Sequence, residues 1–400
     1  MYLEHLSLTD FRSYAQVDLR FDPGVTVLVG SNGIGKTNLM EAIGYLATLS
    51  SHRVSADGPL LRFGTDRALI RAKLVRGEQS TILELEINGG RANRGRINRS
   101  NPVRARDLLG ICHTVLFAPE DLALVKGDPS NRRRFLDELL VSLIPRHAAT
   151  RSDYDRVLKQ RNALLKSGRA GKFTAGHEAT LDVWDQHMAR AGAELLHARL
   201  ELVERLRPHL NNAYAQLTDG SKAADAVYRS TLQNMMDDDG EPASPSAAPS
   251  GQATPAEDLG LLSVDELAER YVQAFAASRR RELERGISLV GPHRDELELV
   301  LGQAPAKGYA SHGETWSMCL SLRLASYYVM LDDARTGGSA PILILDDVFA
   351  ELDVQRRRKL AEIVAGAEQV LVTAAVDADI PDELAGRRVK VIPGGIDEQG

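Results

Sequence analysis

Cysteine and aromatic residues are scarce in this 400-residue sequence. The two cysteines, Cys112 and Cys319, are too few for a zinc ribbon or a disulfide scaffold, and we expect both to be reduced packing residues. Aromatic residues make up 5% of the chain, which argues against a platform on which successive nucleic-acid bases stack. These shortages exclude small disulfide-stapled proteins and proteins built around structural zinc.

Long hydrophobic runs and an excess of positive charge are also absent. No uncharged apolar run approaches the ~18 residues that suggest a membrane span, and Glu4, His5 and Asp10 interrupt the segment where a secretion signal would lie. We therefore expect a cytoplasmic protein with no membrane partner. The 49 Lys and Arg against 55 Asp and Glu give a net charge of −6, which excludes a histone-like coat of positive charge but permits one local basic face.

Hydrophobic residues make up 43% of the chain, enough for a large core, and they follow strand-like patterns near both ends. Apolar and charged residues alternate over 17–22 and 83–87, which predicts strands with one buried face. Residues 25–29, 341–345 and 370–372 are apolar runs containing β-branched residues, typical of strands buried on both faces. Both ends of the chain are thus expected to contribute strands to one α/β core.

The middle of the chain is helical in composition. Apolar residues recur at helical spacing in the following segments: 135–143, 151–166, 181–207 and 263–285. Residues 236–258 are rich in Pro, Ser, Ala and acid, which predicts a disordered surface insertion. We expect a discontinuous core made of 1–130 and 291–400, with 131–290 inserted as a mainly helical lobe.

A glycine-rich segment follows the apolar run 25–29. Residues 30–37 match G-x-x-x-x-G-K-[ST], in which glycines let backbone N–H groups converge on phosphates at the start of a helix. Lys36 is expected to reach the β- and γ-phosphates, and Thr37 to bind Mg²⁺. The predicted nucleotide-binding residues are Gly30, Ser31, Asn32, Gly33, Ile34, Gly35, Lys36, Thr37 and Asn38.

A second motif ends the apolar run near residue 345. Ile344-Leu345-Asp346-Asp347 is the Walker B arrangement, in which a strand carries a carboxylate towards the metal. Asp346 is therefore the predicted metal ligand, and Asp347 is expected to orient or deprotonate the attacking water. The two motifs are far apart in sequence, which distinguishes this chain from compact P-loop proteins.

A third motif, Ser311-His312-Gly313-Glu314, precedes an apolar helix. A short polar loop that opens a helix can bind anions through its N–H groups and the helix dipole. This geometry is common, so the motif gains meaning only from its order among the others.

The order of these motifs resembles ABC-type ATPases of the SMC/Rad50 superfamily and, within it, the RecF family of bacterial recombination mediators. The resemblance extends over essentially the whole chain, and it is carried by the following segments: 8–14, 117–122, 127–137, 291–295 and 345–353. It implies an ABC-type head with an inserted helical lobe and no long coiled coil. It also implies ATP as the nucleotide.

The resemblance further implies that two chains share each site. Ser311 and the N–H of Gly313 would contact the γ-phosphate bound to a second chain, so that ATP joins two heads in a homodimer. Twofold symmetry then gives two equivalent sites. Hydrolysis would remove these contacts and let the dimer open.

Three positions depart from the common ABC pattern. Glu314 stands where glutamine is usual, which leaves the contact of that side chain open. Asp347 stands where most ABC heads have glutamate, and the shorter acid suggests a weak, slow ATPase that acts as a switch. Thr373-Ala374-Ala375 follows the last apolar run, where many relatives have a histidine, so we assign no γ-phosphate sensor there.

Residues 91–106 contain six arginines and no acid. A basic loop beside a turn is a plausible contact for the DNA backbone, and the predicted DNA-binding residues are Arg91, Arg94, Arg96 and Arg99. No motif for reading base sequence is present, so we expect contacts that are not sequence-specific.

The function implied by the resemblance is ATP-dependent DNA binding in recombinational gap repair, at gapped DNA or single-strand/duplex junctions. It would support recombinase loading, replication restart and the SOS response, with RecR and RecO as expected partners. The alternatives are a nucleotide-binding subunit of a transporter and another SMC-like ATPase. DNA-stimulated hydrolysis would separate these possibilities.

Overall fold

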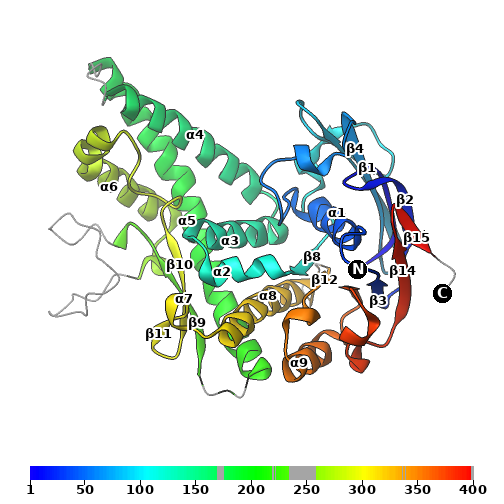
Figure 1. The fold of residues 1–400 in the computed structure, drawn as a ribbon. Helices are drawn as coiled ribbons and strands as arrows, with labels where there is room; N and C mark the ends of the chain where they lie inside the picture. Colours follow the sequence, from blue (N-terminus) through cyan, green and yellow to red (C-terminus); the bar gives the residue numbers. More distant parts are fainter. Residues whose placement is uncertain are drawn as a thin grey trace.

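Figure 1 shows the computed structural model of the chain, in which most of the helices lie on one side and the two six-stranded sheets on the other. The structure describes residues 1–168, 175–218, 220, 222–233, 258–335, 337 and 339–397. The predicted insertion at 236–258 lies outside the described residues, apart from Asp258. No helix in the described part of the chain has the length and apolar character needed to cross a bilayer.

A mainly parallel sheet of six strands, in the order β15-β14-β3-β13-β12-β8, forms the centre of the molecule. Its strands are β3 (Gly24–Val29), β8 (Thr114–Phe117), β12 (Ile342–Asp346), β13 (Gln369–Ala374), β14 (Arg387–Ile392) and the antiparallel β15 (Gly395–Asp397). β3 pairs in parallel with β13 and β14, so a strand from the first part of the chain lies between two strands from the last part.

The central strands are buried on both faces, as the apolar runs predict. Val27 of β3 and Leu343 of β12 belong to one buried cluster, whereas the next residues, Leu28 and Ile344, belong to another. Successive side chains of a strand point to opposite faces, so the sheet separates two cores. One core faces the helices and the other faces a second sheet.

The second sheet is antiparallel, with the order β2-β1-β4-β5-β6-β7. Its strands are β1 (Tyr2–Phe11), β2 (Tyr14–Arg20), β4 (Arg67–Arg76), β5 (Gln79–Asn88), β6 (Arg94–Ile97) and β7 (Val103–Arg104). The predicted alternation is confirmed, because Leu83, Leu85 and Ile87 are buried. Helix α1 (Lys36–Thr48) packs between the two sheets and adds Leu39 and Ile43 to the same core.

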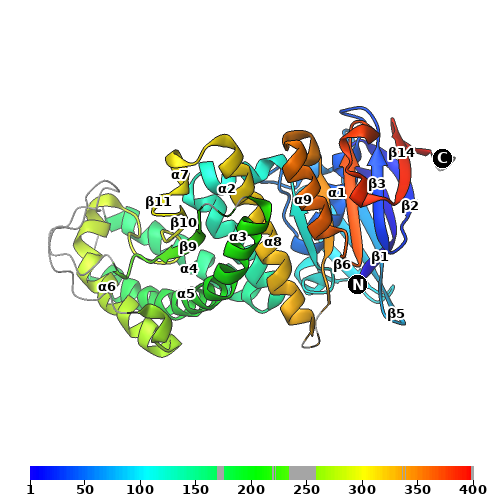
Figure 2. The ribbon, with the colours of Figure 1, turned by 90° about the horizontal axis from the view of Figure 1, so that it is seen from below.

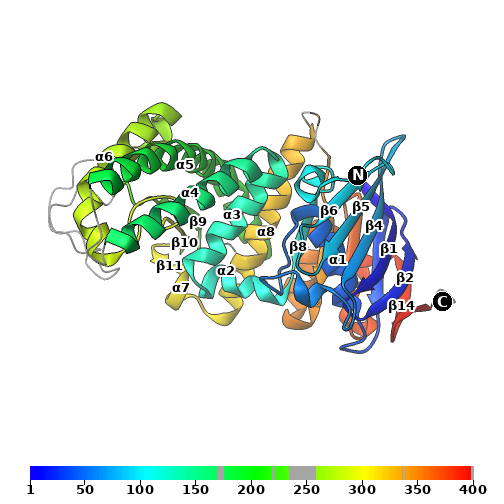
Figure 3. The ribbon, with the colours of Figure 1, turned by 90° about the horizontal axis from the view of Figure 1, so that it is seen from above.

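Helices make up most of the other half of the molecule (Figures 2 and 3). They are α2 (Leu122–Lys126), α3 (Pro129–Leu143), α4 (His147–Ser167), α5 (Ala175–Leu217), α6 (Val264–Arg285), α7 (Ala306–Tyr309) and α8 (His312–Arg335). A three-stranded sheet of β9 (Ala224–Arg229), β10 (Glu296–Leu301) and β11 (Ala304–Pro305) lies among them. Helix α9 (Val354–Val364) lies on the side of the central sheet (Figure 2).

The predicted helices are confirmed, but α5 is longer than its pattern suggested. The segment 181–207 lies inside a helix of 43 residues that continues through Pro208. This helix packs against α4, α6 and α8 of the same chain, so within the described residues it forms no extended coiled coil. Tertiary contacts therefore support a length that the local sequence does not dictate.

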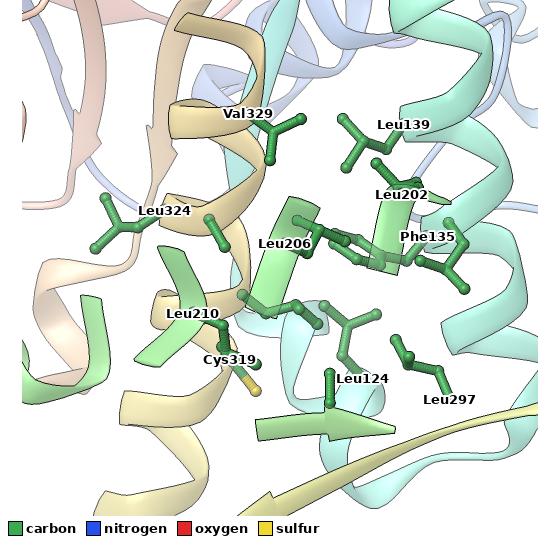
Figure 4. Close-up of a cluster of buried hydrophobic side chains, with 14 of the residues drawn as sticks. Leu124, Phe135, Leu139, Leu202, Leu206, Leu210, Leu297, Cys319, Leu324 and Val329 are labelled. Carbon is green, nitrogen blue, oxygen red and sulfur yellow. The ribbon is translucent and has the colours of Figure 1, made fainter. Parts of the chain in front are cut away.

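Figure 4 shows part of the core among the helices. Side chains from five elements meet there: Leu124, Phe135, Leu139, Leu202, Leu206, Leu210, Leu297, Cys319, Leu324 and Val329. Both cysteines of the chain are free and buried, as expected. Because α8 runs through this core, its first turn is held in a fixed place.

Candidate functional site

The loop between β3 and α1 has a backbone that only small residues fit. Gly33 and Gly35 have φ angles of +83° and +116°, in the region that favours glycine. A Cβ at Gly30 would lie 2.7 Å from the carbonyl oxygen of Val391, and one at Gly35 would lie 2.7 Å from the hydroxyl oxygen of Tyr14. The loop therefore has a tight backbone that leads into the first turn of α1, with N–H groups available to a ligand.

Lys36 lies at the end of this loop and is 3% exposed. Its Nζ donates hydrogen bonds to the carbonyl oxygens of Gly30, at 2.8 Å, and Ser31, at 3.3 Å. Within the described part of the chain, no carboxylate lies within ion-pair distance of this ammonium group. A buried cation bonded only to neutral carbonyls has lost hydration without gaining an opposite charge, so the site is suited to an anion.

Thr37 and Asp346 meet although they are 309 positions apart, with Thr37 Oγ1 3.1 Å from Asp346 Oδ1. Thr373 completes the group, because its Oγ1 donates to the same carboxylate oxygen at 2.6 Å and accepts from the N–H of Asp347 at 2.9 Å. The strand order explains this arrangement. β13, which carries Thr373, lies between β3 and β12.

Thr373 is a site residue that the sequence did not reveal. The segment after the last apolar run has no histidine, so the sequence alone gives it no role as a γ-phosphate sensor. The signal was a hydroxyl at the carboxyl end of a strand, and it becomes informative only when that strand is known to lie beside β12.

The electrostatics of the site are unusual. Burial raises the pKa of Asp346 to about 6, and the nearby charges of Asp347 and Glu120 add to the rise, while hydrogen bonds from Thr373 and Thr37 oppose it. Asp347 has a φ of +51°, a left-handed backbone conformation that is uncommon for residues other than glycine. A compact group of acids with one elevated pKa is typical of a functional site.

The donor set fits a cation that brings further ligands of its own. The hydroxyl of Thr37 and the carboxylate of Asp346 supply two hard oxygen donors. Among the described residues, no group of three or more His, Cys, Asp and Glu side chains could hold a metal. Mg²⁺ typically binds one or two carboxylates together with phosphate oxygens and water, which matches this geometry.

Replacing Asp346 with asparagine is expected to stabilise the nucleotide-free protein at neutral pH. The folded pKa, about 6, lies above the unfolded value of 3.8, so the associated stability is fully present below pH 3.8 and is lost as the pH rises through 6. Over this window the wild-type free energy of unfolding should fall by up to about 3 kcal/mol relative to the variant.

Urea denaturation between pH 4 and 7.5, in the presence of a chelator, measures this difference. Asn101→Ala, which changes an exposed side chain that carries no charge, is the control for a substitution outside the site. A wild-type protein and an Asp346→Asn variant with parallel pH profiles would contradict the assignment.

Ser311 and Glu314 form a reciprocal cap at the start of α8. The N–H of Ser311 donates to Glu314 Oε2 at 2.8 Å, and the N–H of Glu314 donates to Ser311 Oγ at 3.3 Å. Lys222 lies 2.6 Å from Glu314 Oε1, and this partner, followed by the Ser311 bonds, lowers the pKa of Glu314 to about 2. Glu314, which stands where related ATPases usually have glutamine, therefore makes its contacts with Ser311 and Lys222 of its own chain.

Arg356 connects this loop to the start of α9. Its Nε donates to Ser317 Oγ at 2.9 Å, and its guanidinium pairs with Asp353, which also caps α9 by accepting from the Arg356 N–H at 2.9 Å. A Cβ at Gly313 would lie 3.0 Å from Arg356 Nη2, so Arg356 packs directly on the loop. The segments 311–314 and 353–356 therefore form one surface.

One chain does not bring this surface to the phosphate loop. In all three ribbon views, α7 and the start of α8 lie away from α1 (Figures 1, 2 and 3). The start of α8 (His312–Arg335) therefore lies apart from α1, which begins at Lys36, in a single molecule.

The predicted DNA-binding arginines are exposed, but the fold places acids beside them. Arg94 and Arg96 lie on β6 opposite Glu86 and Glu84 of β5. Arg91 donates to the side chain of Asn88 at 2.9 Å, and its Nη2 lies 3.8 Å from Glu86. Arg99 lies in the turn after β6.

The stretch 91–106 contains no acid, yet its neighbouring strand provides two. These acids make the surface around the segment less positive than the sequence of the segment suggested. Local composition could not show this, because it does not reveal which residues face each other across two strands.

A buried carboxylate also orders the first turns of α1. Glu41 is fully buried and accepts two hydrogen bonds from Arg12, at 2.5 and 2.7 Å, and one from Ser51 at 2.5 Å. Burial alone would raise the pKa of Glu41, but these hydrogen bonds outweigh it and hold the pKa below its usual value. Arg53 extends the network to Asn38 at 3.0 Å, so the end of the phosphate loop is braced by the segments around residues 12 and 52.

Comparisons with known proteins agree with this architecture. The family model for the RecF/RecN/SMC N terminal domain matches residues 2–382. The chain is 88% identical, over 100% of both chains, to the DNA replication and repair protein RecF of Paenarthrobacter aurescens. It is 55% identical to the protein of the same name from Streptomyces avermitilis, over 99% of this chain and 100% of the relative.

Solved structures share the fold. The recombination mediator protein RecF-ATPrS in the RecFOR pathway superposes with a TM-score of 0.84 at 23% identity, covering 100% of this chain and 98% of the other. An Smc head domain from Pyrococcus furiosus, bound to the C-terminal domain of ScpA, gives a TM-score of 0.52 at 16% identity, covering 99% and 95%. The predicted fold class, an ABC-type head with inserted helices, is confirmed. Sequence identity along the full length and the match to the family model together establish that the chain belongs to the RecF family.

Proposed function

We propose that the chain binds ATP with Mg²⁺ at the β3–α1 loop and the adjoining ends of β12 and β13. The observation that carries the proposal is the buried ammonium group of Lys36, which has carbonyl partners but no acid in the described part of the chain. Phosphates would supply the missing negative charge, as the RecF-ATP and RecF-ATPrS structures suggest by analogy of fold. The backbone of residues 30–38 would surround them.

The metal-side roles follow from the same geometry. Thr37 and Asp346 are the proposed ligands of Mg²⁺, and the bound ion would neutralise charge on the transferred phosphoryl group. Thr373 fixes the Asp346 carboxylate, and it also holds the backbone of Asp347. Asp347 would orient the attacking water, and its short side chain is consistent with a slow ATPase.

Self-association is the proposed consequence of ATP binding. Ser311 accepts a hydrogen bond from Glu314, which leaves its hydroxyl proton free to be donated. The N–H of Gly313, in the first turn of α8, lacks an intrahelical acceptor. These two donors would contact the γ-phosphate bound to a second chain, which accounts for the separation of the start of α8 from α1 within one molecule.

We further propose that the chain is organised into two lobes. Residues 1–130 and 291–400 would form the ATPase lobe, and 131–290 the helical lobe. The relatives are named DNA replication and repair proteins, and a structural neighbour is a recombination mediator of the RecFOR pathway. The proposed role is ATP-gated binding to DNA during gap repair, with RecR and RecO as partners and with Arg91, Arg94, Arg96 and Arg99 contacting phosphates.

A mobility-shift titration of the full-length protein on single-stranded, duplex and gapped DNA, with and without ATP, tests this role. We expect ATP to strengthen binding to DNA that contains duplex, and added salt to weaken it because phosphate contacts release counterions. DNA should also stimulate ATP hydrolysis, a result that a transporter subunit would not give. Binding that does not respond to ATP would contradict the proposal.

A further inference from the structure

We propose that Phe63 stacks on an unpaired or terminal base and thereby recognises the place where duplex DNA meets a single strand. This inference rests on the DNA binding proposed above and assigns a residue to its selectivity. It also narrows the expectation, drawn from the low aromatic content, that the protein has no platform on which bases stack.

Phe63 is fully exposed, and it differs in this from the other phenylalanines of the described chain. Those are at most 3% exposed: Phe11, Phe21, Phe117, Phe135, Phe275 and Phe349. Leaving a phenylalanine side chain in water forgoes roughly 1.5–3 kcal/mol of burial free energy. An exposed phenylalanine in a chain that buries its other described phenylalanines calls for a partner.

The ring is held outward by an ordered turn. The N–H of Arg62 donates to the carbonyl oxygen of Asp10 at 2.8 Å, which ties the turn to the end of β1. The N–H and the hydroxyl of Thr65 both donate to the carbonyl oxygen of Arg62, at 3.1 and 2.8 Å. Gly64, with a φ of +84°, allows the tight turn that leaves Phe63 at the tip. The presentation of the ring is therefore pre-organised.

The turn adjoins the arginine-rich hairpin. The N–H of Gly89 donates to the carbonyl oxygen of Asp66 at 2.9 Å, and Arg67 pairs with Asn88 across β4 and β5. This register places the turn beside the hairpin segment that leads to Arg91.

Three exposed or half-exposed arginines lie in the turn or on the segments that adjoin it: Arg62, Arg67 and Arg91. Their acidic neighbours are Asp10, at 3.3 Å from Arg62, and Glu86, which is shared by Arg67 at 3.9 Å and Arg91 at 3.8 Å. Ion pairs this long and this exposed are weak, so the guanidinium groups can turn to phosphates.

A base fits this surface better than a protein does. A specific protein interface buries about 800 Å² on each side around several anchors, and this surface has one ring among charges. The other large exposed hydrophobics of the described chain lie on different elements: Ile144, Val183, Leu261, Tyr309, Val354, Val376 and Ile392. Aromatic rings next to cations are the usual platform for nucleobases, because every base has a π-face. Continuous duplex hides those faces, whereas a gap exposes them.

The test compares two DNA molecules that differ in one feature. One is a duplex dumbbell sealed by hairpins at both ends, and the other is the same dumbbell with a gap of a few nucleotides. Fluorescence anisotropy with ATP and the full-length protein should show that Phe63→Ala lowers affinity for the gapped DNA by about 5- to 150-fold, the range for loss of one stacked base. Affinity for the sealed DNA should stay unchanged.

Two variants serve as references. Phe63→Trp keeps a stacking surface and should retain gap affinity, whereas Leu261→Ala removes an exposed side chain elsewhere and should change neither affinity. The inference is overturned if Phe63→Ala weakens both DNAs equally, weakens neither, or is not rescued by tryptophan. Loss of ATP-driven self-association in Phe63→Ala would instead assign the ring to the contact between copies. Wild-type protein that binds neither DNA would refute the proposed function itself, whereas binding that ignores Phe63 would refute this inference alone.

Discussion

Replacing Lys36 with alanine should abolish nucleotide binding and the self-association that depends on it. The ammonium group is buried beside the β3–α1 loop and has two carbonyl partners. Truncating one partner of a buried, hydrogen-bonded charge pair costs about 2–5 kcal/mol, so affinity should fall by at least about 30-fold. The nucleotide-free variant should fold normally, because it loses a buried cation that has no acidic partner in the described chain.

Titration of a fluorescent ATP analogue measures affinity, and sedimentation velocity at saturating ATP measures self-association. Lys390→Ala is a matched control, since Lys390 is exposed on β14 and pairs in register with Val29 at the end of β3. A Lys36→Ala variant that still binds the analogue with wild-type affinity would show that the phosphates lie elsewhere. Wild-type protein that remains monomeric with ATP would refute the shared-site model.

Two inactive variants should restore each other when mixed. Lys36→Ala removes the phosphate-loop contribution, and Ser311→Arg places a bulky cation at the start of α8 while leaving the phosphate loop intact. If each site combines the loop of one chain with α8 of the other, a mixed dimer contains one intact site and one doubly altered site. Activity recovers only if two chains share each site. The structure of one chain favours a shared site, because α1 and the start of α8 lie apart (Figure 1).

The expected magnitude follows from symmetry. Because neither variant dimerises with itself, every dimer in an equal mixture is mixed and has one of two sites intact, so hydrolysis should recover to as much as about half of the wild-type rate. Ser311→Arg alone should bind the ATP analogue normally but stay monomeric, which separates it from Lys36→Ala. The control is the hydrolysis rate of each variant alone, measured at the total protein concentration of the mixture. Recovery no greater than the sum of the separate variants would indicate that each chain is complete on its own.

Local sequence was sufficient for the strands and motifs that lead into the site. The apolar residues of β3 and β12 predict strands buried on both faces. The motifs at the ends of these strands contain Thr37 and Asp346, and the fold brings Thr37 Oγ1 within 3.1 Å of Asp346 Oδ1. Helix α5 was underestimated, because contacts with α4, α6 and α8 extend it past the end of its periodic pattern. Such contacts are determined by the whole chain.

The features of the site that the sequence did not predict depend on which strands are neighbours in the sheets. Thr373 gained a role from the position of β13 between β3 and β12, and Arg94 and Arg96 acquired acidic neighbours from the register of β5 with β6. Phe63 was not predicted as a site residue for a different reason. A low aromatic percentage describes the average of the chain, whereas one exposed ring in a rigid turn is a property of a single place.

The order of strands in the central sheet also has a consequence for biosynthesis. β3 is made early, but its two partners, β13 and β14, belong to the last tenth of the chain. At roughly 5–20 residues per second, the ribosome needs roughly 17–70 s to advance from the end of β3 to the end of β13. Throughout that interval both edges of an apolar strand lack their final partners, so the nascent chain is a candidate for chaperone protection. A chain that stops before β13 would carry the glycine loop without the sheet that holds it in place.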